Sequence, residues 1–258
     1  MLLAFDVGNT TIAVGLFRGR KLVKSWKIKT DSDRTGDEYG ALVLDLMRIA
    51  GLPPGKVTGA VISSVVPPLT PVVEQVCRDC FGTEALVVGP GLKTGMPILY
   101  ENPLEVGADR ITAAVAAFEK HGGPVIVVDF GTATTFDAVS AKGEYLGGAI
   151  APGIRIAAEA LYLKTAKLPR IEIRKPKRAI GRTTVSSMQS GLYFGYVGLV
   201  TRTIEEIRKE LGRTARVVAT GGFGSQVAAE LDTIEAFEPD LVLEGLRIIH
   251  ERNRDARD

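Results

Sequence analysis

The feature that most constrains the fold of this chain is a short acidic glycine motif that occurs twice. The first copy, Asp6-Val7-Gly8-Asn9-Thr10-Thr11, directly follows an apolar run at residues 2–5. The second copy, Asp129-Phe130-Gly131-Thr132-Ala133-Thr134, directly follows an apolar run at residues 125–128. Each copy is typical of a buried strand that turns back through glycine into a second strand. The copies stand 129 − 6 = 123 residues apart in a chain of 258, and this spacing predicts a duplicated fold.

The chemistry of the motif suits a nucleoside triphosphate and its cation. Glycine lets backbone N–H groups approach phosphate oxygens, while Asn9, Thr10 and Thr11 supply more donors than a two-residue turn needs. A carboxylate such as Asp6 can hold a cation that neutralises the phosphates. An ordinary hairpin turn is the alternative interpretation of a single copy, and the second copy favours phosphate binding at both turns.

Composition and charge exclude several classes of protein. Apolar residues make up 45% of the chain and charged residues 24%, which are ordinary values for a globular protein. The net charge of +2 gives no reason to expect nucleic acid or a membrane surface as a partner. The apolar runs are strand-sized, so no transmembrane helix is expected, and Asp6 comes too early for a secretory signal. We therefore expect a cytoplasmic protein with no nucleic-acid and no membrane partner.

Hydrophobic periodicity predicts an α/β chain in which each half begins with a three-strand meander. In the first half, residues 1–121, we expect strands at 2–7, 11–17, 22–28, 60–65 and 85–88, and helices at 37–50, 69–81 and 106–121. In the second half, residues 122–258, we expect strands at 124–128, 135–139, 145–150, 215–219 and 234–237, and helices after Gly153, over 184–211, after Gly222 and over 240–252. Residues 89–106 and 164–182 are expected to be irregular. No Walker A or GxGxxG motif occurs, so P-loop and dinucleotide-binding folds are not supported.

The densest polar segment, residues 101–110, precedes the apolar helix expected over 106–121. Acidic residues are common in the first turn of a helix because they interact with the helix dipole, and this is the alternative to a functional role. Helix-start preferences do not explain Arg110, since a cation is unfavourable at that end. A carboxylate beside a guanidinium suits recognition of a hydroxyl and an anion. Asp109 is therefore a candidate catalytic residue.

A second glycine pair, in Thr220-Gly221-Gly222, follows a predicted strand of the second half. It could be a strand-to-helix turn that simply needs glycine. It could also provide flat backbone against which an adenine lies. The two phosphate turns upstream favour the adenine interpretation.

Taken together, these residues resemble type III pantothenate kinase, a family in the superfamily of actin, sugar kinases, acetate kinase and heat-shock chaperone ATPases. The resemblance runs nearly end to end. Its acidic glycine and Gly-Gly elements are shared across the superfamily, whereas Gly-Ala-Asp-Arg with a downstream Gly-Arg-x-Thr is specific to the family. The matching segments are Asp6-Val7-Gly8-Asn9-Thr10, Gly107-Ala108-Asp109-Arg110, Asp129 to Thr134, Gly147-Gly148 with Pro152-Gly153, Gly181-Arg182 with Thr184, and Thr220-Gly221-Gly222.

The resemblance implies a duplicated ribonuclease-H-like, actin-like ATPase fold, with two mixed sheets flanked by helices and ATP in a cleft between the halves. It implies phosphorylation of the primary hydroxyl of pantothenate to 4'-phosphopantothenate, the first step of coenzyme A biosynthesis. It places Asp6 near a magnesium ion. The residues that it assigns to ATP are Asp6, Val7, Gly8, Asn9, Thr10, Thr11, Ile12, Ala13 and Thr132, with Gly221 and Gly222 beside the adenine.

For the acceptor, the resemblance implies that Asp109 is the base on the pantothenate hydroxyl, and we expect the helix dipole to keep its carboxylate ionised near neutral pH. Asp129 would ligate a monovalent cation, K⁺ or NH₄⁺. Thr184 would reach pantothenate from the neighbouring subunit, so the active form would be a homodimer with shared sites. Thr183 or Thr184 also suits the N-cap of the long helix. The remaining residues assigned to the pantothenate pocket are Tyr100, Gly107, Ala108 and Arg110.

Three alternatives remain open at this point. The first is a kinase of the same fold that acts on another small polyol or acid. The second is a non-catalytic nucleotide-binding or regulatory protein, which would be expected to have lost the Gly-Ala-Asp-Arg segment that is intact here. The third is an actin-like filament former.

Overall fold

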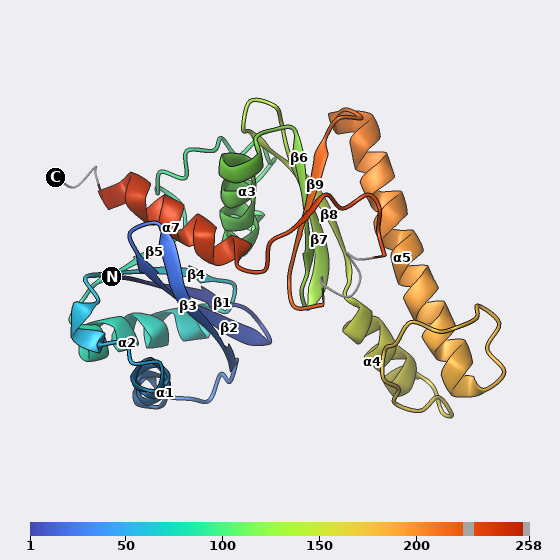
Figure 1. Ribbon diagram of the computed structural model, residues 1–258, viewed down its shortest axis with the longest axis horizontal. Helices are drawn as coiled ribbons and strands as arrows, with labels where there is room; N and C mark the ends of the chain where they lie inside the picture. The colour runs from blue at the N-terminus through green and yellow to red at the C-terminus, as the bar shows by residue number, and fades with distance from the viewer. Residues whose placement is uncertain (224–229, 255–258) are drawn as a thin grey trace. The chain divides into compact units, whose positions relative to one another are not determined.

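The computed structural model describes residues 1–223 and 230–254. Its backbone contacts divide the chain into two compact units, namely Met1–Lys120 together with the segment that begins at Asp240, and His121–Pro239 (Figure 1). The boundary expected after residue 121 lies one residue from this division. The closing segment, which we expected in the second half, belongs instead to the first unit. The helix expected after Gly222 falls on residues 224–229 and lies outside the described residues.

The first unit is built on a five-stranded mixed sheet with the order β3-β2-β1-β4-β5. Strands β1, β2 and β3 form an antiparallel meander, while β4 and β5 continue the sheet in parallel with β1. Parallel neighbours need crossover connections, which the helices between these strands provide. The strands are β1 (Leu2–Val7), β2 (Thr11–Arg18), β3 (Lys21–Lys29), β4 (Gly59–Ser64) and β5 (Ala85–Val87).

Helices α1 and α2 bury one face of this sheet. Apolar residues of β1, β2 and β4, such as Phe5, form one core cluster with Tyr39 of α1 and Val73 of α2. A capping box between Thr35 and Glu38 starts α1, and Gly82 ends α2 with a left-handed φ of +62°. The helices of the unit are α1 (Gly36–Ile49), α2 (Thr70–Phe81), α3 (Ala108–His121) and α7 (Leu241–Arg254), with three short 3-10 helices, η1 (Pro54–Lys56), η2 (Pro67–Leu69) and η3 (Pro103–Glu105).

Helix α7 returns from the end of the chain to pack on β1, β2 and β4. The strands make room for it with small residues, since Leu243 Cδ1 lies 3.0 Å from the position that a Cβ would take on Gly15. A Cβ on Gly245 would overlap the carbonyl oxygen of Thr112, so α7 also lies against α3 at backbone distance. These apolar contacts explain why the closing segment belongs to the first unit.

The second unit repeats the same topology. Its sheet has the order β10-β9-β6-β7-β8, with β6, β7 and β8 antiparallel and β9 and β10 parallel to β6. If the strands of each unit are numbered 1 to 5 along the chain, both sheets have the order 3-2-1-4-5, which is the ribonuclease-H-like topology. The expected duplicated fold is therefore confirmed. The strands are β6 (Val125–Phe130), β7 (Ala133–Val139), β8 (Tyr145–Pro152), β9 (Arg216–Thr220) and β10 (Ala236–Phe237).

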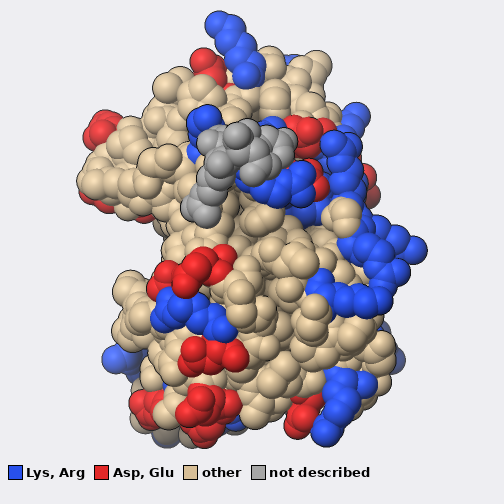
Figure 2. Space-filling model, turned by 90° about the vertical axis from the view of Figure 1, so that its left-hand side faces the viewer, with Lys and Arg blue, Asp and Glu red and all other residues tan. Residues whose placement is uncertain are grey.

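The long helix α5 (Thr184–Leu211) covers one face of the second sheet, and α4 (Ile154–Lys164) follows β8 (Figure 1). Tyr196, Val200 and Ile204 of α5 form a core cluster with apolar residues of β6 and β9. Residues 165–182, all of them described, contain no helix or strand, as expected. On the face that Figure 2 shows, basic and acidic side chains are interspersed over a largely uncharged surface. Among the described residues, no helix combines the length and the apolar composition that a membrane span requires.

Candidate active site

The first acidic glycine turn closes the hairpin of β1 and β2. The Gly8 N–H donates to the carbonyl of Thr11 over 3.1 Å, and the Thr30 hydroxyl donates to the carbonyl of Gly8 over 2.6 Å. The side chains at the tip, Asn9 and Thr10, are exposed. The turn is therefore held in place by its own strands and by the end of β3, while its polar tip can approach a ligand.

Asp6 lies one residue before the end of β1, between two neighbouring strands. It stands opposite Ala13 of β2 and Ser63 of β4. The Ser63 hydroxyl is fully buried and finds no hydrogen-bond partner among the described residues. Sequence analysis missed Ser63 because a serine inside an apolar strand carries no motif, and only the parallel register of the folded sheet places it beside Asp6.

The second acidic glycine turn is one residue shorter than the first. The pair Asp6 and Ala13 spans 13 − 6 = 7 residues, whereas Asp129 and Thr135 span 135 − 129 = 6. Strand β7 begins at Ala133, two residues earlier than expected, because the ladder with β6 continues to the end of that strand. The second turn is thus a compact version of the first, and Gly131 and Thr132 are exposed at its tip.

Close backbone packing surrounds the second turn. Asp129 stands opposite Thr220 at the end of β9, and the next residue, Gly221, has a φ of +95°. A Cβ on Gly221 would lie 2.6 Å from the carbonyl carbon of Phe130 and would overlap Asp129 Oδ1, so only glycine is tolerated there. Gly153, the N-cap of α4, lies against the backbone of the turn, since a Cβ there would lie 2.9 Å from the carbonyl oxygen of Gly131 and would overlap that of Thr132. The positive end of the α4 dipole therefore favours an anion near this turn.

Asp109 lies at the start of α3, beside the first turn. Its Oδ1 accepts a hydrogen bond of 2.8 Å from the Arg110 N–H. A Cβ on Gly107 would lie 2.5 Å from this oxygen and 3.4 Å from Val65 Cγ1, so the glycine makes room for the carboxylate. The Val65 N–H in turn donates to the carbonyl of Val7 over 3.0 Å. The end of β4 therefore joins Asp109 to the strand that carries Asp6.

The pKa of the Asp109 carboxyl is shifted by its surroundings in the folded protein. Burial raises the pKa of its carboxyl above the ordinary value for aspartic acid, while the backbone N–H and the charge of Arg110 lower the pKa by less. Desolvation therefore outweighs the favourable interactions at the helix start in setting this pKa. That the carboxylate is ionised near neutral pH stays a prediction. A carboxylate with a raised pKa is a better proton acceptor near neutral pH, which suits a general base.

The segment before α3 is ordered by its own polar side chains. Asn102 caps η3 by accepting from the Leu104 N–H over 3.3 Å, and its amide donates to Glu105 Oε1 over 2.8 Å. Two of the polar residues singled out in the sequence thus serve local structure. Tyr100 is half-buried just before this turn, and Ala108 is the first residue of α3.

The start of α5 presents Thr184. Thr183, and not Thr184, is the N-cap, and it forms a capping box with Ser186. Thr184 is exposed and lines a hollow of about 600 Å³ with Arg182 and Met188, among others. Its hydroxyl is therefore available to a ligand or to another subunit.

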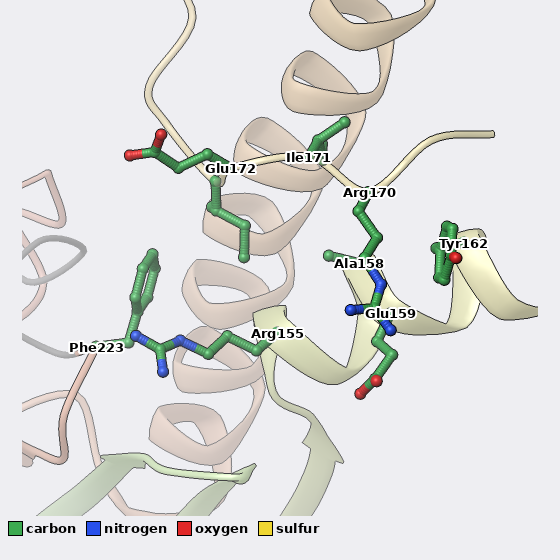
Figure 3. A pocket seen from close by; sticks show the side chains of 9 residues that line it. Arg155, Ala158, Glu159, Tyr162, Arg170, Ile171, Glu172 and Phe223 are labelled. Carbon is green, nitrogen blue, oxygen red and sulfur yellow. The ribbon is translucent and has the colours of Figure 1, made fainter.

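A cavity of about 440 Å³ in the second unit was not predicted from the sequence. It lies between α4, the irregular segment at 170–173 and Phe223, which directly follows Gly222 (Figure 3). Arg155 of α4 reaches toward Phe223, while the Arg170 guanidinium lies 4.7 Å from the centre of the Tyr162 ring. The cavity thus combines aromatic and aliphatic surfaces with two guanidinium groups and the carboxylates of Glu159 and Glu172.

Taken together, a repeated ribonuclease-H-like unit with an acidic glycine turn in each copy places the chain in the actin-like ATPase fold class. A model of the type III pantothenate kinase family matches residues 2–206. The chain belongs to the type III pantothenate kinase family, and its activity is the phosphorylation of pantothenate in coenzyme A biosynthesis.

The similar proteins agree with this assignment. A type III pantothenate kinase of Geobacter sulfurreducens is 56% identical over 255 residues, which cover 99% of this chain and 100% of that protein. One of Pelobacter propionicus is 55% identical over 254 residues, which cover 98% and 100%. Among solved structures, a Baf family protein of Campylobacter jejuni aligns with a TM-score of 0.62 over 98% of this chain and 99% of that one, and its 19% identity supports the fold alone.

Proposed function

We propose that Asp109 is the general base that directs the primary hydroxyl of pantothenate at the γ-phosphoryl group of ATP, giving 4'-phosphopantothenate. The observation that carries this proposal is the half-buried Asp109 carboxylate beside the end of β1, the strand that leads into the first acidic glycine turn. Phosphoryl transfer has a loose transition state, so the enzyme mainly positions the reactants and neutralises charge. Asp109 therefore needs only to orient the hydroxyl and accept its proton late. The test is a coupled ADP-release assay with pantothenate, ATP, Mg²⁺ and K⁺, in which replacing Asp109 removes turnover.

Both acidic glycine turns contact ATP in this proposal. The exposed tip of each turn and the N-terminus of α4 supply donors to the phosphates. We further propose that the cavity beside Phe223 takes the adenine, with the aromatic ring as a stacking surface. The ATP-binding residues of the proposal are Asp6, Val7, Gly8, Asn9, Thr10, Thr11, Ile12, Ala13, Thr132, Gly221 and Gly222.

The acceptor pocket of the proposal is formed by Tyr100 and the segment Gly107-Ala108-Asp109-Arg110. Pantothenate carries a carboxylate as well as its hydroxyl, and the guanidinium of Arg110 suits such an anion. Gly107 and Ala108 have little or no side chain and leave space for the substrate next to Asp109. A carboxylate and a hydroxyl are thus recognised by adjacent residues of one helix start.

The donor groups of the two turns suit two different cations. No group of three or more His, Cys, Asp or Glu side chains gathers within residues 1–223 and 230–254. Mg²⁺ in kinases is commonly held by one or two carboxylates together with phosphate and water. The single carboxylate of Asp6 is therefore sufficient as the protein ligand. Bound there, Mg²⁺ would neutralise phosphate charge. Asp129 lies against the backbone of Phe130, so a carboxylate and nearby carbonyl groups can together suit K⁺ or NH₄⁺.

The monovalent cation gives a direct prediction. In Na⁺ as the sole monovalent cation, turnover is expected to fall several-fold below that in K⁺ or NH₄⁺, because the smaller ion fits the Asp129 site poorly. Asp129→Asn is expected to remove most of this difference. Initial rates of ADP release in matched chloride salts measure both effects. Equal rates of the wild-type enzyme in Na⁺ and K⁺ would contradict the role of Asp129.

We also propose that the active form is a homodimer in which Thr184 reaches the pantothenate bound to the neighbouring subunit. The exposure of Thr184 at the start of α5 supports this, because its hydroxyl can be reached by another chain.

Mixing two inactive variants tests the shared site. In a heterodimer of Asp109→Asn and Thr184→Ala subunits, one site carries both changes and the other carries neither. Activity is therefore expected to reappear on mixing, whereas each variant alone stays nearly inactive. Differently tagged subunits and a two-step purification isolate the heterodimer for the rate measurement. Heterodimers as inactive as their parents would exclude sharing through Thr184.

The proposal places the enzyme in the cytoplasm, where ATP and the later enzymes of coenzyme A synthesis are available. Pantothenate and a second copy of the chain are its only proposed partners besides ATP and the two cations.

A further inference from the structure

The segment that carries the acceptor residues has little secondary structure of its own. Residues 88–107 join β5 to α3, and all of them are described. They contain the single turn η3 and otherwise no helix or strand. A segment without regular secondary structure keeps a fixed position only where contacts with other elements hold it. The contacts that hold it therefore decide where Tyr100 and the start of α3 lie.

Asn253, near the end of α7, provides the first of these contacts. Its side chain is only 9% exposed. The carboxamide oxygen accepts from the Lys93 N–H over 3.1 Å, and the amide donates to the Lys93 carbonyl over 3.0 Å and to the Ile249 carbonyl over 2.8 Å. A buried amide thus pairs with both backbone groups of one residue, as a neighbouring strand would. Alanine would leave these backbone groups unsatisfied.

Arg252 provides the second contact. Its Nη1 donates to the carbonyl of Thr94, and its Nη2 forms an ion pair of 2.8 Å with Glu119 in the last turn of α3. Gly95, with a φ of +70°, leaves room for the guanidinium, because a Cβ there would be 2.8 Å from the Arg252 Cζ. Arg252 therefore ties the irregular segment to α3, the helix that bears Asp109.

Hydrogen bonds within the segment 93–96 also hold it in one conformation. The Thr94 hydroxyl accepts from the Met96 N–H over 3.2 Å and donates to the Met96 carbonyl over 3.0 Å. The Met96 side chain is 5% exposed. Residues 93–96 form a fixed point from which the chain runs through residues 97–99 to Tyr100. The other fixed point is the start of α3.

From these contacts, we propose that Arg252 and Asn253 are positioning residues for the acceptor substrate, acting through the segment 93–96 on Tyr100 and Asp109. They hold one end of the acceptor segment from a helix at the opposite end of the sequence. The inference rests on the proposed role of Tyr100 and Asp109 in binding pantothenate. It adds that the last helix of the chain sets the affinity for pantothenate without touching it.

Steady-state kinetics of Asn253→Ala and Arg252→Gln test the inference. Each variant is expected to raise KM for pantothenate by roughly tenfold to a hundredfold, because a displacement of about 1 Å at a binding segment has an effect of this size. KM for ATP should stay near the wild-type value. Hydrogen exchange at the amides of residues 98–102 should become faster in both variants. Arg252→Gln is the less disruptive change, since its side chain is 31% exposed, and it serves if Asn253→Ala fails to fold.

Glu251→Gln is the matched control. Glu251 stands next to Arg252 on α7, and it pairs with Arg20 and Arg247 rather than with the acceptor segment. Its replacement should leave both KM values and the hydrogen exchange of residues 98–102 unchanged. Equal increases in both KM values for the Arg252 and Asn253 variants, or lower stability with unchanged KM for pantothenate, would overturn the inference.

Tyr100→Ala separates this inference from the proposed function. If Tyr100→Ala raises KM for pantothenate and the Arg252 and Asn253 variants do not, the acceptor pocket stands and the positioning role is excluded. If Tyr100→Ala leaves KM for pantothenate unchanged, the proposed acceptor pocket is itself wrong, and the positioning role is excluded with it.

Discussion

Replacing Asp109 with asparagine is expected to lower kcat for pantothenate phosphorylation by about 10²- to 10⁴-fold, the usual contribution of a general base. The asparagine amide can still contact the substrate hydroxyl, but it cannot accept the proton. KM for ATP should change little, because the turns proposed to bind ATP are left intact. Steady-state rates from a coupled ADP-release assay measure both parameters. Turnover close to that of the wild-type enzyme would exclude Asp109 as the base.

The same variant gives a second readout that does not depend on catalysis. Because burial raises the pKa of Asp109 in the folded protein, the folded state binds this proton more tightly than the unfolded chain does. The resulting stability is present below the unfolded pKa and is lost as pH rises through the folded pKa. Asp109→Asn, which stays neutral, should therefore gain stability relative to wild type as pH rises from acid to neutral. Urea unfolding across that range tests this, and a difference independent of pH would contradict it.

Gly221→Ala is expected to have the second large effect, on stability and activity together. The residue has a φ of +95°, and the added methyl group would lie 2.6 Å from the carbonyl carbon of Phe130 and overlap Asp129. Strain of this kind costs roughly 2–4 kcal/mol. The displaced Asp129 should also weaken the cation site, so turnover in K⁺ should fall. Urea unfolding and initial rates in K⁺ provide the two measurements.

Gly222→Ala is the matched control for this change. A Cβ on Gly222 has no neighbouring atom within 4 Å among the described residues, so its stability should equal that of wild type. If the adenine lies against this backbone, the methyl group should raise KM for ATP several-fold while leaving kcat intact. Equal losses of stability from the two alanines would show that packing around Asp129 is not the cause.

The fold could be predicted from the sequence largely because it is duplicated. Each unit begins with an apolar strand, an acidic glycine turn and two further strands. Because this pattern occurs twice, the strand assignment in one half supports the same assignment in the other half. The placement of α7 could not be predicted in this way. Periodicity identifies a helix and its apolar face, but the partner of that face, here the strand containing Gly15, is decided by packing between distant parts of the chain.

The candidate site was only partly accessible to sequence reasoning. Motifs identified Asp6, Asp109 and Asp129, because turns and helix starts have strong local signals. The direction of the Asp109 pKa shift was missed, since burial depends on the surrounding fold rather than on neighbours in the sequence. Contacts between distant residues were missed for the same reason, such as that of Asn253 with Lys93.

The assignment of α7 to the first unit has a consequence for how the protein is made. The second unit is one continuous stretch of chain, so it can fold as soon as it leaves the ribosome. The first unit lacks α7, the helix that covers part of its sheet, until residues 241–254 have been translated. While the second unit is being synthesised, the apolar surface that α7 later covers is therefore exposed on the nascent chain.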